Sequence, residues 1–314
     1  MRALVTGGAG FIGSHLVDAL VARGDQVGVV DNLSSGRREN LSDAISAGAS
    51  LIEADVGDRQ ALTAACAELR PEVVFHLAAQ IDVRRSVADP VYDLGINVGA
   101  TIELLDLCVE AGTSRFVLAS TGGAIYGEGA GRELPLDENA ERRPAAPYGQ
   151  SKLAAEGYAA LYGRLHGLST VALRLGNVYG PRQDPHGEAG VVAIFCNTFL
   201  RGQRPRIFGD GTQTRDYVFV ADVVDAFVAA ADSGASDAFN VGTGIESSVL
   251  DLGRKLAAFC DRDFDPELVP PRPGEVQRIA IDSRRAASEL DWAAQTELDR
   301  GLELTAESFR RQRA

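Results

Sequence analysis

The first half of the chain alternates short runs of apolar, β-branched residues with longer segments of helical periodicity. The apolar runs predict strands at 2–6, 26–31, 50–55, 72–79, 115–120 and 169–175. The periodic segments predict helices, the clearest of them at 11–23, 91–112 and 148–167. Because the strands are apolar on both faces, we expect a parallel sheet covered by helices on both sides. The alternation therefore predicts an α/β fold with a doubly wound parallel sheet and right-handed crossovers.

This alternation ends after Asn177. The later chain contains segments rich in Gly, Pro and polar residues, at 176–190, 202–216 and 266–278. Helical periodicity returns near 189–201 and 222–232. We expect residues 1–175 to form the first domain and residues 176–314 to form mainly a smaller, loop-rich α/β domain over the carboxyl edge of the sheet. Part of 215–245 is expected to return to the first domain.

Composition and charge narrow the range of partners. The chain has 314 residues, 45% of them hydrophobic and 24% charged, which is ordinary for a globular protein. Its formal net charge is −13, which argues against a nucleic-acid or anionic-membrane partner. No apolar run approaches the roughly 20 residues of a membrane span. A phosphate-bearing ligand stays possible, because backbone N–H groups bind phosphate locally.

The spacing of the cysteines and histidines indicates neither a redox motif nor a metal site. The four cysteines form no C-x-x-C pair, and "MRALVTGGAG" does not have the long apolar run of a signal peptide. These features predict reduced, buried thiols and a cytoplasmic protein. The four histidines have no metal-ligand spacing, so we expect no metal site; they stand at 15, 76, 166 and 186.

The glycine-rich segment "TGGAGFIG" (6–13) follows the first predicted strand and opens the first predicted helix. Gly7, Gly10 and Gly13 have the spacing of a loop that lets a pyrophosphate approach the helix N-terminus, as in a Rossmann domain. Asp31 ends the second predicted strand, where a carboxylate accepts hydrogen bonds from ribose hydroxyls and repels a 2′-phosphate. The cofactor predicted from this pair of features is NAD. Arg37 and Arg38 are expected to face solvent.

A second candidate site lies in "PYGQSK" (147–152), where Tyr148 and Lys152 share one helical face. A free phenol has a pKa of about 10, and lowering it to about 7 requires roughly 4 kcal/mol. One positive charge at about 5 Å contributes roughly 3 kcal/mol at an effective dielectric near 20. Lys152 and an oxidised nicotinamide together therefore suffice to make Tyr148 a general base.

Several longer motifs carry a family resemblance. They are "TGGAGFIGSHL", "DNLSSG", "HLAAQ", "NVGAT", "YGQSK", "NVYGPRQDP", "RDYVFVADV", "NVGTG" and "RPGEVQR". With these motifs the chain resembles the extended short-chain dehydrogenase/reductase superfamily over nearly its whole length. Within it, the chain is especially similar to the bacterial UDP-glucose (UDP-galactose) 4-epimerases.

The resemblance implies a reaction and the residues that carry it out. Tyr148, assisted by Lys152, would take the proton of the sugar 4-hydroxyl while NAD accepts the hydride at carbon 4, and the transient 4-keto sugar would be reduced on its opposite face. The implied cofactor contacts, besides Tyr148 and Lys152, are Gly7, Gly10, Phe11, Ile12, Gly13, Asp31, Asn32, Ser35, Gly36, Asp55, Val56, Leu77, Ala78, Ala79 and Asn97.

The resemblance also implies how the UDP-sugar is bound and how the chain assembles. Asn177 would contact the diphosphate-sugar, Arg215 and Arg272 would neutralise the diphosphate, and Glu275 would bind the uridine ribose. Tyr126 would shape the pocket. An ion pair of Arg215 with Asp216 or Asp222 is the alternative role for that arginine. A homodimer is expected through the helices predicted at 91–112 and 148–167.

One position departs from the family pattern. Members usually have Ser or Thr four residues before the tyrosine of the "VYG"-like motif, and here that position is Gly122. We expect Thr121 to supply the missing hydroxyl through a local backbone shift, or else a water to take its place. Gly122 and Gly123 also lack the acidic side chains of the dehydratases and decarboxylases in this superfamily, which leaves oxidation and re-reduction at one carbon.

Two alternatives remain open at this point. The substrate could be UDP-glucuronate or a UDP-N-acetylhexosamine rather than UDP-glucose and UDP-galactose. The chain could also be a non-catalytic NAD sensor, although such proteins often lose the tyrosine or the lysine that this chain keeps.

Overall fold

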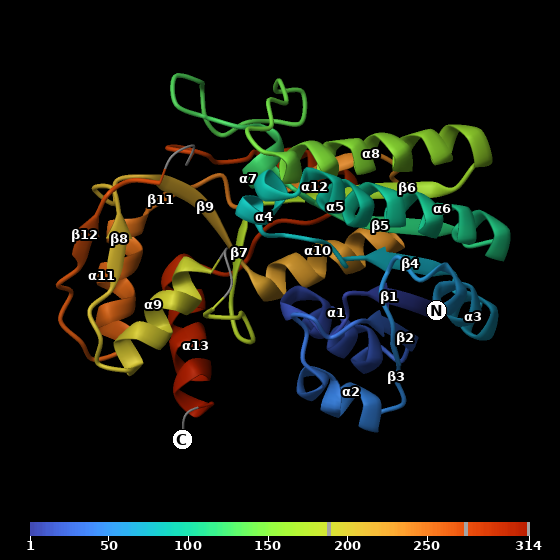
Figure 1. Ribbon diagram of the computed structural model, residues 1–314, viewed down its shortest axis with the longest axis horizontal. Coiled ribbons are helices and arrows are strands. Elements are labelled where there is room, and N and C mark those ends of the chain that lie inside the picture. Colours follow the sequence, from blue (N-terminus) through green and yellow to red (C-terminus); the bar gives the residue numbers. More distant parts are fainter. Residues whose placement is uncertain (187–189, 273–275, 313–314) are drawn as a thin grey trace.

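A computed structural model describes residues 1–186, 190–272 and 276–312. Its larger part is a parallel sheet of seven strands in the order β3-β2-β1-β4-β5-β6-β10 (Figure 1). The strands are β1 (Arg2–Thr6), β2 (Gln26–Asp31), β3 (Ser50–Glu53), β4 (Val73–His76), β5 (Arg115–Thr121), β6 (Ser169–Leu175) and β10 (Ala238–Val241). The order reverses between β1 and β4, which is the switch point of a doubly wound sheet. This topology confirms the predicted fold class.

Helices cover both faces of this sheet. One face carries α1 (Phe11–Ala22), α10 (Val220–Asp232) and α12 (Arg284–Leu290), and the other carries α3 (Arg59–Leu69), α6 (Ala100–Ala111) and α8 (Pro147–His166). Strand β1 shows why the sequence runs are apolar throughout: Ala3 and Val5 join the core under α1 and α10, whereas Leu4 joins the core under α3, α6 and α8. Successive side chains point to opposite faces, so both faces need apolar residues.

Shorter helical segments connect these elements. They are η1 (Arg38–Leu41), α2 (Ser42–Ser46), α4 (Val83–Ala88), α5 (Pro90–Leu94), the π-helical η2 (Gly95–Gly99) and α7 (Gly122–Ile125). The single helix predicted over 91–112 is therefore three segments, with a π-helical stretch between α5 and α6.

The second part of the chain forms a smaller lobe beside the carboxyl ends of the sheet strands (Figure 1). Its strands are β7 (Asn177–Tyr179), β8 (Arg206–Phe208), β9 (Thr214–Phe219), β11 (Glu246–Ser248) and β12 (Glu267–Val269), and its helices are α9 (Val191–Leu200), α11 (Val249–Phe259) and α13 (Leu298–Arg311). Strands β11, β9 and β7 form one sheet, and β12 pairs with β8. Aromatic and aliphatic side chains of α9, α11 and α13 form a separate core.

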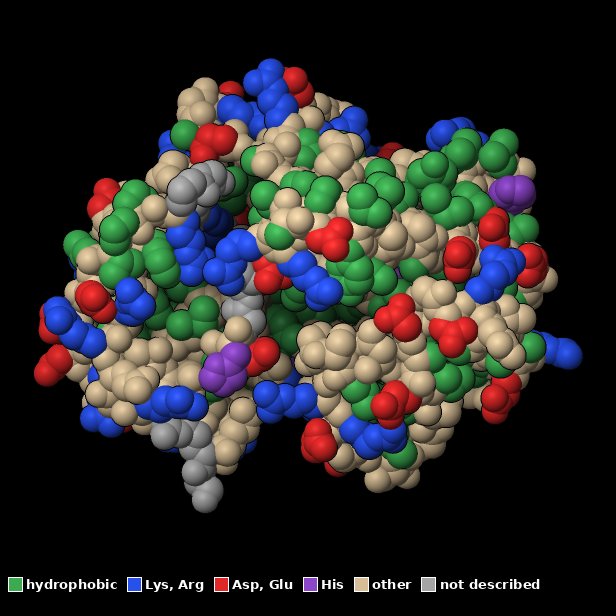
Figure 2. Space-filling view, in the orientation of Figure 1, with side chains coloured by type: hydrophobic (Ala, Val, Ile, Leu, Met, Phe, Trp, Pro, Cys, Tyr) green, Lys and Arg blue, Asp and Glu red, His purple; other side chains and the backbone are tan. Residues whose placement is uncertain are grey.

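The two parts meet along the edge where the strands of the large sheet end. Figure 2 shows the surface hollowed between them, with Lys and Arg side chains on the rim nearer the small lobe. In the described part of the chain, no helix is long and apolar enough to cross a membrane. The four cysteines are free and buried.

We predict that Leu104→Ala, on α6, lowers the free energy of unfolding by about 2–5 kcal/mol, because Leu104 is fully buried between the sheet and its helices and truncation leaves a cavity. The matched control is Leu268→Ala, at a side chain that is 59% exposed, with an expected change within about 0.5 kcal/mol. Urea unfolding measures both, and equal losses would contradict the assignment of the core.

Candidate active site

The glycine loop after β1 is shaped so that only glycine fits at two positions. Gly7 has a φ of +71°, and a Cβ there would lie 2.6 Å from the amide nitrogen of Ala78. A Cβ on Gly13 would lie 2.1 Å from the carbonyl oxygen of Gly7. The first turn of α1 therefore packs closely on the loop. The free N–H groups and the positive dipole end of α1 face the edge of the sheet. These features fit the pyrophosphate of a dinucleotide.

The end of β2 holds the predicted ribose-binding carboxylate. Asp31 is 8% exposed, and its oxygens accept hydrogen bonds from the amides of Ala9 (2.9 Å) and Leu33 (2.8 Å). Because a carboxylate oxygen accepts more than one bond, it keeps capacity for ribose hydroxyls. Gly36 lies against this group, since a Cβ there would be 3.0 Å from Asp31 Oδ1. Ser35 lies exposed in the same turn.

Neighbouring residues complete the adenosine end. Asn32 donates to Asp55 Oδ2 at 2.7 Å, so the two predicted residues are adjacent, and Val56 is buried beside them. Arg38 pairs with Glu53 at 3.0 Å. Arg37 is exposed, as expected for a residue that faces solvent.

The segment after β4 is fixed to the glycine loop and to the π-helical segment. The hydroxyl of Thr6 accepts from the Ala78 amide at 3.3 Å and bonds His76 Nδ1 at 2.7 Å. Asn97 accepts from the Gln80 amide at 2.9 Å and is 2% exposed. Asn97 therefore holds the loop that carries Leu77, Ala78 and Ala79 in place.

The catalytic pair lies on the first turns of α8, as the sequence predicts. Tyr148 is half-buried, and the side chain of Thr121, the last residue of β5, lies near enough to the phenol to lower its pKa. Lys152 is 4% exposed and donates to the carbonyl of Ala119 at 2.9 Å. The structure thus brings together the three residues that the sequence analysis named as catalytic.

The pKa values of this pair are set mainly by burial. Burial, reinforced by the Asp93 carboxylate, raises the pKa of Tyr148 to about 12, and the side chain of Thr121 opposes that rise. Burial lowers the pKa of Lys152 to about 8, while Asp93 and Glu156 counteract the fall. The protein's own groups therefore keep the phenol protonated at neutral pH. The Lys152 ammonium, expected to acidify the phenol, is instead directed at the Ala119 carbonyl.

The glycine that departs from the family pattern has a steric explanation. A Cβ on Gly122 would lie 2.7 Å from Cδ1 of Ile281, so Ile281 occupies the space that a serine or threonine would need. Asn177 lies next to this turn, with its Oδ1 3.5 Å from the position of a Cβ on Gly123. Thr121 is the hydroxyl-bearing residue that lowers the pKa of Tyr148 here.

Tyr126 is in the core rather than at the cleft surface. Its side chain is fully buried, and its hydroxyl donates to Asn240 at 2.8 Å and accepts from Arg174 at 2.9 Å. Its predicted part in shaping the pocket is therefore an indirect one, through packing behind the site.

The residues predicted to bind a diphosphate lie in the small lobe. Arg215, on β9, donates to the Thr214 carbonyl at 2.8 Å. The Arg272 guanidinium lies 3.9 Å from the ring centroid of Phe208, on β8. Glu275 lies outside the described residues.

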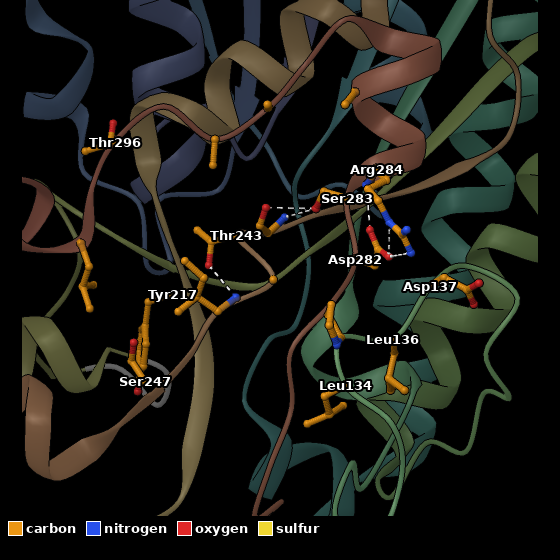
Figure 3. Close-up of a pocket in the computed structure, with 18 of the residues that line it drawn as sticks. Leu134, Leu136, Asp137, Tyr217, Thr243, Ser247, Asp282, Ser283, Arg284 and Thr296 are labelled. Carbon is orange, nitrogen blue, oxygen red and sulfur yellow. Dashed lines mark hydrogen bonds and ion pairs between the residues drawn. The ribbon is translucent and has the colours of Figure 1, made fainter.

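A cavity of about 850 Å³ lies behind this site (Figure 3). Its described lining comes from the segments 134–137, 242–244, 282–284 and 293–298, and none of those residues is one of the predicted site residues. Ile281 separates the two regions, because a Cβ on Gly242 would lie 2.6 Å from it and a Cβ on Gly122 2.7 Å.

The sequence analysis missed Asp93, which is fully buried beside the catalytic pair. It stands four residues before Asn97 and bonds it at 3.0 Å. That spacing is the signal that could have identified it, because Asn97 was already expected to contact the cofactor and Asp93 lies one turn before it in the same predicted helix.

Comparisons with known proteins identify the family. Residues 3–242 match the model of the NAD dependent epimerase/dehydratase family. The chain belongs to that family. It is 48% identical to a UDP-glucose 4-epimerase of Mycolicibacterium smegmatis over 99% of both chains. These findings confirm the resemblance drawn from the motifs.

Solved structures agree with this assignment. The UDP-glucose 4-epimerase of Thermotoga maritima with UDP-glucose superimposes with a TM-score of 0.96, at 44% identity over 100% of both chains. The Thermus thermophilus UDP-glucose 4-epimerase in complex with NAD superimposes with a TM-score of 0.91, at 42% identity over 99% of both chains. The family and the fit of the glycine loop and Asp31 confirm NAD as the cofactor.

We predict that Gly13→Ala weakens NAD binding at least about tenfold, or about 1.4 kcal/mol, because the added methyl group collides with the Gly7 carbonyl. The matched control is Gly157→Ala, in the middle of α8, where a Cβ would meet no atom within 4 Å. Calorimetric titration with NAD compares the variants, and unchanged affinity in Gly13→Ala would contradict the proposed placement of the pyrophosphate.

Proposed function

We propose that the chain is a UDP-glucose 4-epimerase, an isomerase that interconverts UDP-glucose and UDP-galactose by inverting carbon 4 through a transient 4-keto sugar. The observation that carries the proposal is the position of Tyr148 and, one turn along α8, of the buried Lys152 ammonium, beside the end of β5 at the carboxyl edge of an NAD-binding sheet. Relatives of this name at 44–48% identity over nearly the whole chain support the choice of substrate.

The two parts of the structure bind different ligands. Residues 1–175, with β10, hold the cofactor, and residues 176–314 supply most contacts to the nucleotide sugar. NAD, when bound, accepts a hydride from carbon 4 of the sugar and returns it. The chain's own residues have to bind the sugar, orient carbon 4 and move one proton.

Tyr148 is the group that moves the proton. With oxidised NAD bound, the phenol would lie beside a positive charge that the protein's own groups do not provide, and Tyr148 would then be basic enough to act. Tyr148 would take the proton of the 4-hydroxyl and return it to the same oxygen at the end of the cycle. Thr121 would stabilise the phenolate by donating a hydrogen bond.

The small lobe provides the contacts for the diphosphate. Arg215 and Arg272 would neutralise it, since guanidinium groups form bidentate bonds with phosphate oxygens. Asn177 lies beside Gly123 and would contact the sugar end. Glu275 is proposed to bind the uridine ribose.

The glycines at 122 and 123 favour simple epimerisation over the related reactions. Neither residue offers an acid to remove water or carbon dioxide from a keto sugar, and Ile281 fills the adjoining space. An apolar side chain at this point suits an uncharged hexose better than the carboxylate of UDP-glucuronate.

We predict that Tyr148→Phe lowers kcat for the conversion of UDP-galactose to UDP-glucose by about 10²–10⁴-fold, because the proton acceptor is lost. NAD binding should stay within about twofold of wild type. Tyr158→Phe is the matched control, since Tyr158 lies on the same helix and is 39% exposed; its kcat should not change. A Tyr148→Phe variant with wild-type turnover would refute the assignment.

The same proposal includes a homodimer in the cytoplasm. Helices α5, α6 and α8 lie side by side, and green apolar side chains lie over this region in Figure 2. The exposed apolar residues of these helices and of α4, which we call the apolar face, are Val83, Val87, Val91, Tyr92, Leu94, Val109, Tyr158 and Leu165. Burying such a face against a second copy would remove apolar surface from water.

The proposed cytoplasmic location is supported by the cysteines. The four thiols are free and buried, which is in keeping with a reducing compartment.

We predict that Val91→Glu converts the dimer to a monomer in light-scattering chromatography, since Val91 is 76% exposed on the apolar face and a charge there is costly to bury. Ile245→Glu, at a 64% exposed side chain outside that face, should leave the dimer intact. A wild-type chain that elutes as a monomer would contradict the predicted assembly.

A further inference from the structure

Beneath the first turn of α8 lies a carboxylate for which the sequence analysis assigned no role. Asp93 is fully buried on α5, and three neutral side chains donate hydrogen bonds to it: Gln80 at 2.8 Å, Asn97 at 3.0 Å and Ser151 at 2.6 Å. A buried carboxylate costs several kcal/mol unless its bonds are satisfied, and these donors satisfy it without an arginine or lysine in direct contact. Its charge is therefore available to act on groups nearby.

These bonds tie the carboxylate to the catalytic turn on one side and to the cofactor loop on the other. Ser151 directly precedes Lys152 in the first turns of α8, so the Ser151–Asp93 bond fixes the carboxylate relative to the catalytic pair. Asn97 and Gln80 belong to the segments that hold the loop after β4 against Gly7. The carboxylate thus occupies a fixed place between the two halves of the site.

We propose that Asp93 is a positioning residue for the epimerase reaction: its carboxylate, fixed beneath the first turn of α8, keeps Lys152 charged and keeps Tyr148 in its protonated form until a cofactor with a positive ring is bound. This inference rests on the proposed function. It assigns to Asp93 a constant electrostatic effect on Lys152 and Tyr148, which is present whichever form of the cofactor is bound.

The directions in which Asp93 shifts the pKa values of its neighbours agree with this role. Asp93 raises the pKa of both Tyr148 and Lys152. Of the other titratable groups nearby, His76 has a pKa lowered to about 3 by burial and by Lys152, so it stays neutral. Glu156, which is ion-paired with Arg174 at 2.8 Å, also raises the pKa of Lys152, whereas Asp93 raises the pKa of both Lys152 and Tyr148. The remaining charged groups of α4, α5 and their caps are Asp82, Arg84, Arg85 and Asp89, and Arg85 lies over the ring of Tyr92.

The charge can be removed without changing the shape of the site. In Asp93→Asn, the amide oxygen can face the two amide donors of Gln80 and Asn97, while the amide nitrogen faces Ser151, whose hydroxyl can turn to accept. Asp89→Asn is the matched control, because it removes an exposed charge at the N-cap of the same helix α5 and asparagine caps a helix equally well.

The test uses NAD-loaded protein and two readouts. The first is the pH profile of kcat with UDP-galactose, and the second is the ultraviolet titration of Tyr148, isolated by subtracting the Tyr148→Phe protein. Removing a negative charge lowers both neighbouring pKa values, so in Asp93→Asn both limbs of the profile and the tyrosine titration should move to lower pH by about one unit. Asp89→Asn should show the wild-type profile.

Coincident titrations in wild type and Asp93→Asn would overturn the proposal, as would an equal shift in Asp89→Asn. If Asp93→Asn does not fold, Asp93→Ser removes the charge with a smaller side chain and is judged by the same criteria. The tyrosine titration needs no turnover, so it still decides the role of Asp93 if wild type does not interconvert the two UDP-sugars. In that event the proposed function fails and the electrostatic inference is tested independently.

Discussion

Two opposite charges and a phenol lie close together where α5 packs on the first turns of α8, and the site depends on how they are held. Asp93 and Lys152 are buried and Tyr148 is half-buried, so the Asp93 charge shifts the pKa values of Lys152 and Tyr148 more than it would at the surface. Burial alone would favour a neutral lysine and a neutral phenol. Whether the lysine carries charge, and when the phenol loses its proton, therefore depends on the fixed positions of neighbouring groups.

The fold supplies those positions through rigid elements. Strand β5 ends at Thr121, α8 presents Tyr148, and the segment after β4 is tied to Asn97. The glycine loop brings the first turn of α1 to the same edge, since Gly13 allows the backbone to approach closely. A cofactor bound across this edge meets the catalytic helix because the strand order of the sheet reverses there.

Sequence periodicity predicted much of this scaffold. The strands expected at 2–6, 26–31 and 169–175 match β1, β2 and β6, because runs that are apolar on both faces are typical of buried parallel strands. The π-helical break at Gly95–Gly99 was not predicted, since a helical pattern does not distinguish an α-turn from a wider one.

The candidate site was predictable where a motif fixes the local geometry and unpredictable where distant segments meet. The glycine loop, Asp31 and the Tyr148–Lys152 pair are local patterns. Ile281 fills the space beside Gly122 from about 160 residues further along the chain, and no spacing rule relates such positions. Asp93 reaches the catalytic pair through packing of α5 on α8, which a pattern along one helix does not show.

The most direct test of this account is to titrate Tyr148 in the wild-type protein loaded either with NAD⁺ or with NADH, using ultraviolet difference spectra against the Tyr148→Phe protein. The account predicts ionisation near neutral pH with the positively charged cofactor and a proton retained well into the alkaline range with the reduced one. The same titration curve in both forms, or a tyrosine that stays protonated with NAD⁺, would contradict the claim that cofactor charge controls the base.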